Sequence, residues 1–172
     1  AALLLQRQLS LDERPPVLRR GSLMIRDTPG QLRIPERRLV GHFQSLGLEV
    51  VGGLDDLEPD RRFDLITAFH VVEHLPDPRK TLRELSGRLV DGRSELVVEV
   101  PAASDALLTL YGSRAFAEFT YWSCHLYLFT AATLRRLGEE AGLRVNFIRQ
   151  VQRYPLSNHL HWLAAGGPGG HQ

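Results

Sequence analysis

The decapeptide FHVVEHLPDP, residues 69–78, holds the residue types in this chain that most readily do chemistry. His70, Glu73 and His74 spell H-x-x-E-H, a pattern in which two histidines and a carboxylate can serve a zinc peptidase. Such a site needs a helix through all five residues, so that both histidines project from one face. The same letters could instead be the end of a buried strand that runs into a turn. The two interpretations predict different proteins.

Local chemistry opposes the helix. Val71 and Val72 are β-branched and favour strands, and Pro76 and Pro78 disfavour helical backbone at the residue before each. The preceding run FDLITAF, residues 63–69, is nearly all apolar, which is typical of a strand buried on both faces of a parallel sheet. We therefore expect the motif at the carboxyl end of a central strand, where open α/β sheets bind ligands, and we assign no metal ligands.

The elements that must position this motif alternate along the chain. We expect helices at 36–47, 79–90 and 130–142, and strands at 48–51, 63–69, 94–101 and 143–152. Strands that alternate with helices of this length imply βαβ units, and so an α/β fold with a doubly wound, mostly parallel sheet and flanking helices. Residues 1–36 look irregular, although SLMI, residues 22–25, could be a strand.

Composition indicates one ordinary globular domain. The chain has 172 residues, 43% of them hydrophobic and 24% charged, and a net charge of +1. That charge offers no global attraction to nucleic acid or to an anionic membrane, and no stretch approaches the roughly 20 apolar residues of a membrane span. AALLLQRQL at the start is too short for a signal peptide and lacks a basic leader. The single cysteine, Cys124, suits a reducing cytoplasm, so we expect a cytoplasmic protein.

Residues 63–101, FDLITAFHVVEHLPDPRKTLRELSGRLVDGRSELVVEVP, resemble the second half of a class I S-adenosylmethionine-dependent methyltransferase. The resemblance rests on the FD strand, the EHL and PDP blocks, a helix ending near a glycine, and a strand ending in VP. It implies a Rossmann-like core over residues 37–150 of a single domain, 1–172. The other parts of that domain are an irregular or degenerate N-terminal part, an aromatic substrate segment and a tail: 1–36, 102–129 and 151–172.

One feature of that family has no counterpart in the first sixty residues. The family binds its cofactor through a glycine-rich loop, typically G-x-G-x-G, whose backbone N–H groups approach the methionine part closely. Six glycines occur in this part of the chain and form no such loop: Gly21, Gly30, Gly41, Gly47, Gly52 and Gly53. Two hypotheses follow, an enzyme that uses S-adenosylmethionine and releases S-adenosylhomocysteine, and a non-catalytic methyltransferase-like binding or scaffold domain.

The resemblance also implies which residues meet the cofactor. Glu36 is the nearest candidate for the acid that holds the ribose hydroxyls, and Asp55 lies near where the family meets adenine. The remaining candidates lie at the end of the 63–69 strand and in the motif after it: Ala68, Phe69, His70, Glu73 and His74. Their alternative roles are sheet packing, turn hydrogen bonding and solvated loop charge.

The aromatic stretch after residue 102 suggests a substrate site. Tyrosine, tryptophan and histidine combine an apolar body with a polar tip, which suits a pocket with a few placed donors. The candidates come from this stretch and from a second polar cluster in the tail: Tyr111, Tyr121, Trp122, His125, Tyr154, Asn158 and His159. Core packing and surface capping are the alternatives.

Methyl transfer is an in-line displacement at a sulfonium carbon, for which alignment and a dry pocket supply much of the rate. A hydroxyl acceptor also needs a base near neutral pH, and histidine is the natural choice. We expect His125 in that role, with His70 and His159 behind it. The expected substrate is a small polar metabolite such as a sugar, with no nucleic acid or membrane partner. Exposed sheet edges would favour a homo-oligomer.

Overall fold

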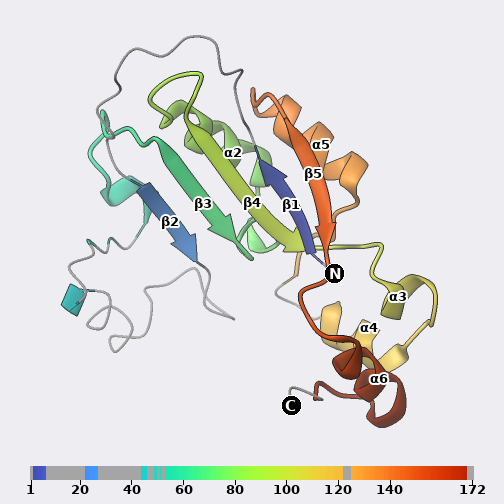
Figure 1. The fold of residues 1–172 in the computed structure, drawn as a ribbon. Coiled ribbons are helices and arrows are strands. Elements are labelled where there is room, and N and C mark those ends of the chain that lie inside the picture. The colour runs from blue at the N-terminus through green and yellow to red at the C-terminus, as the bar shows by residue number, and fades with distance from the viewer. Residues whose placement is uncertain are drawn as a thin grey trace.

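The computed structural model describes residues 2–6, 22–26, 44–45, 49, 51, 53–121 and 125–169. In this part of the chain five strands form one sheet, in the order β2-β3-β4-β1-β5 (Figure 1). The strands are β1 (Ala2–Gln6), β2 (Ser22–Arg26), β3 (Leu65–Phe69), β4 (Glu95–Pro101) and β5 (Phe147–Val151). β2, β3 and β4 run parallel, and β1 lies antiparallel between β4 and β5. The predicted α/β sheet of mostly parallel strands is confirmed.

The N-terminal part differs most from the elements expected from the sequence. β2 contains the SLMI run and pairs in parallel with β3, so that strand is confirmed. β1 contradicts the irregular assignment, because Ala2 pairs with both Pro101 and Val151. A five-residue apolar run without turn signals around it does not reveal partners so far along the chain. Residues 7–21 and most of the helix expected at 36–47 lie outside the described residues, and Glu49 and Val51 of the strand expected at 48–51 belong to no strand.

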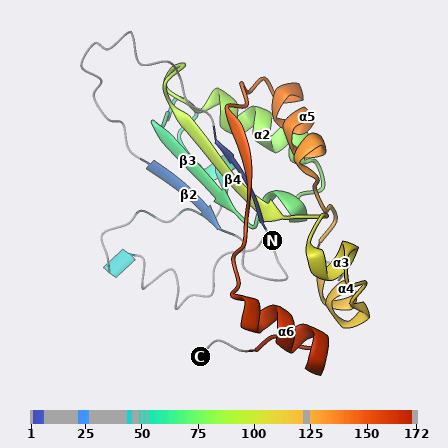
Figure 2. The same cartoon turned by 45° about the vertical axis from the view of Figure 1, so that its right-hand side comes forward.

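Two helices cover one face of the sheet, α2 (Pro78–Gly87) and α5 (Ala131–Glu140) (Figures 1 and 2). The side chain of Asp77 caps α2 by accepting a hydrogen bond from the Lys80 N–H at 2.9 Å, and a proline opens the helix. α2 ends earlier than the predicted residue 90, because Arg88 and Val90 exchange backbone hydrogen bonds with Phe63. Residues at the end of the predicted helix therefore bond to Phe63 and extend the sheet.

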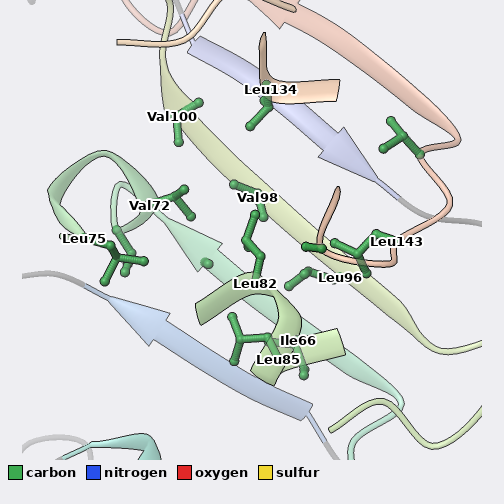
Figure 3. Packing of buried hydrophobic residues seen from close by; sticks show 14 of the residues in the cluster. Ile66, Val72, Leu75, Leu82, Leu85, Leu96, Val98, Val100, Leu134 and Leu143 are labelled. Carbon is green, nitrogen blue, oxygen red and sulfur yellow. The ribbon is translucent and has the colours of Figure 1, made fainter. Parts of the chain in front are cut away.

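The core lies between these helices and the sheet. Leu82 and Leu85 of α2 point onto Ile66 and Val98 (Figure 3), and all four side chains are buried. Burial alternates along β3 and β4, so one face of each strand is fully covered and the other is half-buried. The apolar run FDLITAF predicted burial on both faces. In the described part of the chain, the helices packed on the sheet occupy one face only.

Three further helices lie beyond the carboxyl ends of β3 and β4, α3 (Ala106–Thr109), α4 (Arg114–Thr120) and α6 (Leu156–Ala165) (Figures 1 and 2). α6 is a helix in the tail, for which no helix was predicted, and it ends at Gly166 in the left-handed conformation. Trp162 of α6 is buried and meets Phe116 of α4 edge-on, with ring centroids 5.2 Å apart. No helix among the described residues is long and apolar enough to cross a bilayer.

Candidate active site

The H-x-x-E-H motif is not helical. β3 ends at Phe69, and His70 follows with a φ of 56°, in the left-handed region. The next residues form η2 (Val72–His74), a single 3-10 turn. The predicted strand end and turn are therefore confirmed, and the continuous helix that a zinc peptidase would need is absent from these five residues.

His70 connects the ends of two neighbouring strands. Its backbone N–H donates to the Glu99 carbonyl at 2.9 Å, and its Nε2 lies 3.2 Å from the Glu99 carboxylate on β4. On the other side its Nδ1 lies 3.3 Å from the Glu73 carboxylate. Arg153, which follows β5, contacts His70 Nε2 and donates to Glu99 Oε1 at 3.1 Å. The carboxyl ends of β3 and β4 thus carry an alternating set of acidic and basic groups.

Glu73 is the most buried charged residue of the motif. Its side chain is 0% exposed, and neither carboxylate oxygen receives a hydrogen bond from the described residues. His70 Nδ1 at 3.3 Å and His74 Nε2 at 3.8 Å are within ion-pairing distance of Oε1. Burying a carboxylate without hydrogen-bond donors costs free energy of folding. The surrounding structure must therefore hold the Glu73 side chain in this position.

His125 reaches the same place from the aromatic segment. The main-chain N–H groups of Leu126 and Tyr127 donate to the Glu73 carbonyl at 2.9 and 3.2 Å. The His125 ring lies 4.8 Å from the His74 ring, and its Nδ1 is 2.7 Å from the Thr120 carbonyl. A carbonyl only accepts, so Nδ1 donates and Nε2 of the neutral ring carries the lone pair. The structure therefore brings together His70, Glu73, His74 and His125, which were predicted separately as cofactor and catalytic residues.

Two other cofactor candidates lie on the strand itself. Ala68 is completely buried within the hydrophobic core, as expected for the packing role that was its alternative, and its contact with the cofactor stays a prediction. Phe69 is half-buried at the end of β3. Glu36, and Trp122 among the substrate candidates, lie outside the described residues.

Asp55 lies away from this cluster. It is exposed in η1 (Leu54–Asp56), and the carbonyl of its neighbour Leu54 accepts from the Arg88 side chain at 3.1 Å. The Arg88 carbonyl in turn accepts from Phe63 at the amino end of β3. Asp55 therefore lies toward the amino end of β3, whereas His70 follows its carboxyl end. The structure does not place Asp55 with the other candidates.

The remaining substrate candidates are mostly at the surface. Tyr111, Tyr121 and Tyr154 are 56%, 62% and 48% exposed. Asn158 is buried and donates to the Gly169 carbonyl at 2.9 Å, and His159 lies 3.2 Å from the Gln152 side chain. These contacts fold the tail upon itself, which is the capping role considered as the alternative.

Two members of the cluster, Glu99 and Arg153, were not predicted. Glu99 could have been found from the sequence, because it is the lone acidic residue in the apolar run LVVEV. A charged residue in a buried strand is usually paired. Arg153 left none, since it is one of many arginines scattered along the chain. Only the fold shows that it reaches back to β3 and β4.

Comparison with known proteins identifies the family. Residues 22–146, well over half of the chain, match the family model described as a methyltransferase domain. The chain belongs to this methyltransferase family. Its α/β architecture agrees with the Rossmann-like fold implied by the sequence, and membership implies the use of S-adenosylmethionine.

A curated relative provides a more distant similarity. The ubiquinone biosynthesis O-methyltransferase of Aeromonas salmonicida (strain A449) is 30% identical to the chain over 105 residues. The aligned region covers 59% of this chain and 44% of that protein. The chain thus spans less than half the length of this relative, which supports the family without identifying a substrate.

Proposed function

We propose that this methyltransferase domain transfers the methyl group of S-adenosylmethionine to a hydroxyl of a small polar metabolite, such as a sugar. The proposal rests on the position of His125. This residue of the aromatic segment lies beside Glu73 and His74 at the carboxyl ends of the strands. This is the edge where α/β sheets bind ligands. The name of the Aeromonas relative, an O-methyltransferase, supports oxygen as the acceptor atom.

The acidic groups at this edge fit the cofactor. S-adenosylmethionine presents ribose hydroxyls, which donate to carboxylates, and a sulfonium centre, which is attracted to negative charge. Glu99 is 21% exposed and lies beside His70 at the strand ends, so both side chains are candidates for holding the cofactor. The cofactor supplies an activated methyl group, whose transfer leaves a neutral thioether.

The chain's own task is to align the acceptor and remove its proton. As the acceptor oxygen attacks the methyl carbon, the carbon–sulfur bond breaks and its electron pair stays on sulfur. The acceptor proton must leave in the same stage of the reaction. His125 Nε2 is suited to this, because the Nδ1–H bond to the Thr120 carbonyl fixes the ring and its tautomer.

The experiment combines turnover and stability for His125→Ala. With methyl-labelled S-adenosylmethionine and a panel of sugars and phenols, wild type should label at least one acceptor. The variant should turn over roughly 10²–10⁴-fold more slowly, the usual contribution of a positioned base. His161→Ala is a matched control, because the ring of His161 lies 2.9 Å from the Gly167 carbonyl within the tail region.

A structural role for His125 gives a different result. Its removal would leave the Thr120 carbonyl without this donor and cost about 1–3 kcal/mol of stability. A variant that melts earlier but keeps a near-normal rate per folded molecule would end the proposed catalytic role.

A second candidate function is a non-catalytic binding or scaffold domain. The observation behind it is the absence of a G-x-G-x-G loop from the first sixty residues. It predicts no labelled acceptor from any panel, and no binding of S-adenosylhomocysteine by a correctly folded chain.

A further inference from the structure

Three side chains at the strand ends could share one cation. An oxygen of Glu73 and one ring nitrogen each from His74 and His125 lie within 4.8 Å of one another. Glu73 is fully buried, and its carboxylate oxygens receive no hydrogen bond from the described residues. The nearest polar neighbours of this carboxylate are His70 Nδ1 at 3.3 Å and His74 Nε2 at 3.8 Å. A buried carboxylate with so few contacts is destabilising unless a positive partner compensates it. A bound cation would be such a partner.

The contacts around His125 match those of a metal ligand. A metal-binding histidine usually donates its other ring N–H to a carbonyl or carboxylate, which fixes the orientation of the ring. His125 does this with the Thr120 carbonyl at 2.7 Å. Two main-chain bonds to the Glu73 carbonyl, and the Tyr127 hydroxyl donating to the Pro76 carbonyl at 3.2 Å, hold the His125 segment against η2. The backbone thus preorganises the donor set.

We propose that Glu73, His74 and His125 bind a divalent transition-metal ion, with zinc as the best fit. Two imidazoles and one carboxylate form a set that zinc accepts, whereas magnesium prefers oxygen ligands throughout. Ligand atoms around a tetrahedral zinc are about 3.4 Å apart, so the three groups would close by about an ångström on binding. Three protein ligands leave a fourth position open, as in catalytic zinc sites.

This site differs from the H-x-x-E-H arrangement suggested by the sequence. A peptidase would use both histidines of the motif, but His70 Nε2 is engaged by Glu99 and Arg153. The third ligand comes instead from His125, about fifty positions along the chain. Zinc binding should therefore depend on His125 in the proposed site, and it should not in the peptidase arrangement.

The catalytic consequence rests on the proposed function. An acceptor hydroxyl at the open position would ionise more easily, as water does on zinc, and its proton would pass to solvent before the oxygen attacks the methyl carbon. His125 would then assist as a ligand in place of a general base. Its removal slows methyl transfer in both cases, but only a ligand role also removes metal.

The test measures metal binding without cofactor or acceptor. The metal-free chain is titrated with zinc chloride by calorimetry, and with cobalt(II), whose visible absorption reports nitrogen and oxygen ligation. Wild type should bind about one ion per chain and melt at a higher temperature with zinc. His74→Ala and His125→Ala should each weaken binding by at least about tenfold.

Controls exclude other histidines. His161→Ala, which changes a histidine of the tail whose ring lies 2.9 Å from the Gly167 carbonyl, should keep wild-type zinc affinity. Circular dichroism checks folding, and His125→Gln replaces the alanine variant if that variant unfolds. The proposal is overturned if the folded wild type takes up no zinc at high micromolar concentration. It is equally overturned if zinc is retained by the folded His74 and His125 variants, or lost from His161→Ala.

Separate readouts keep the two proposals apart. Zinc binding that depends on His74 and His125, in a chain that binds no S-adenosylhomocysteine, would refute the proposed function and leave the metal site standing. Methyl transfer that continues unchanged in excess chelator, by a chain without zinc affinity, would refute the metal site alone.

Discussion

His70 is the residue at which the backbone and the candidate site meet. It is the one non-glycine residue with a positive φ in the described part of the chain, and its ring lies between two carboxylates. A side chain in the left-handed region costs roughly 1–2 kcal/mol, and such strain is concentrated at functional sites. We infer that the contacts of the ring with Glu73 and Glu99 compensate for the strained backbone.

This conformation predicts the ranking of substitutions at His70. His70→Asn and His70→Val both remove the imidazole, but asparagine tolerates the left-handed region and valine does not. The valine variant should therefore be less stable than the asparagine variant by about 1–2 kcal/mol in urea unfolding. Equal stability of the two variants would show that residue 70 adopts an ordinary backbone conformation.

The sequence predicted part of the candidate site. β-branched residues and two prolines correctly placed the motif at a strand end, because their effects are local. The meeting of His125 with Glu73 could not be predicted in the same way, since it depends on main-chain bonds to the Glu73 carbonyl. Backbone carbonyls leave no trace in a sequence pattern.

At the scale of elements, α2 and α5 are joined at the end of α5. The Glu140 carboxylate accepts from Arg136 at 2.7 Å within α5 and from Arg79 of α2 at 3.4 Å, and its carbonyl accepts from Arg83 at 3.4 Å. The hydrogen bond from Arg136 is the main cause that lowers the pKa of Glu140 below its ordinary value, and the same bond raises the pKa of Arg136.

The lowered pKa predicts how this ion pair depends on pH. Because the folded-state pKa of Glu140 is below the unfolded value, its contribution to stability is present at neutral pH and is lost as the pH falls through the folded-state pKa. Glu140→Gln should thus melt below wild type at neutral pH, with a gap that closes in acid and shrinks in high salt. Melting curves of both proteins across the acidic range check this.

Glu139→Gln is the matched control, because Glu139 pairs with Arg135 at the longer distance of 3.8 Å. Its gap from wild type at neutral pH should be smaller. A Glu140→Gln gap that persists unchanged into strong acid would contradict an electrostatic origin.

Elements were predicted where their signals are local. The apolar faces and stop signals of α2 and α5 gave both helices, and the apolar runs gave β3 and β4. The strand expected at 143–152 contains β5, which starts later, at Phe147. β1 and α6 were missed for different reasons. β1 is defined by strand partners far along the chain, and α6 is held by Trp162 packing on the rings of Phe116 and Phe119.

In the whole molecule, the candidate functional side chains lie together at the carboxyl ends of the strands. β3, β4 and the segment after β5 contribute His70, Glu99 and Arg153, and the aromatic segment contributes His125. Family membership explains the sheet and implies the cofactor, while the acceptor and the residues that bind it stay proposals. Self-association, expected from exposed sheet edges, stays a prediction.

Calorimetric titration with S-adenosylhomocysteine measures whether the domain binds its cofactor, as the proposed site at the carboxyl ends of the strands requires. We expect saturable binding of about one ligand per chain, with a dissociation constant in the micromolar range typical of enzyme ligands. Adenosine monophosphate, which lacks the homocysteine part, should bind far more weakly. No heat from S-adenosylhomocysteine at high micromolar concentration, in a chain shown to be folded, would contradict the account.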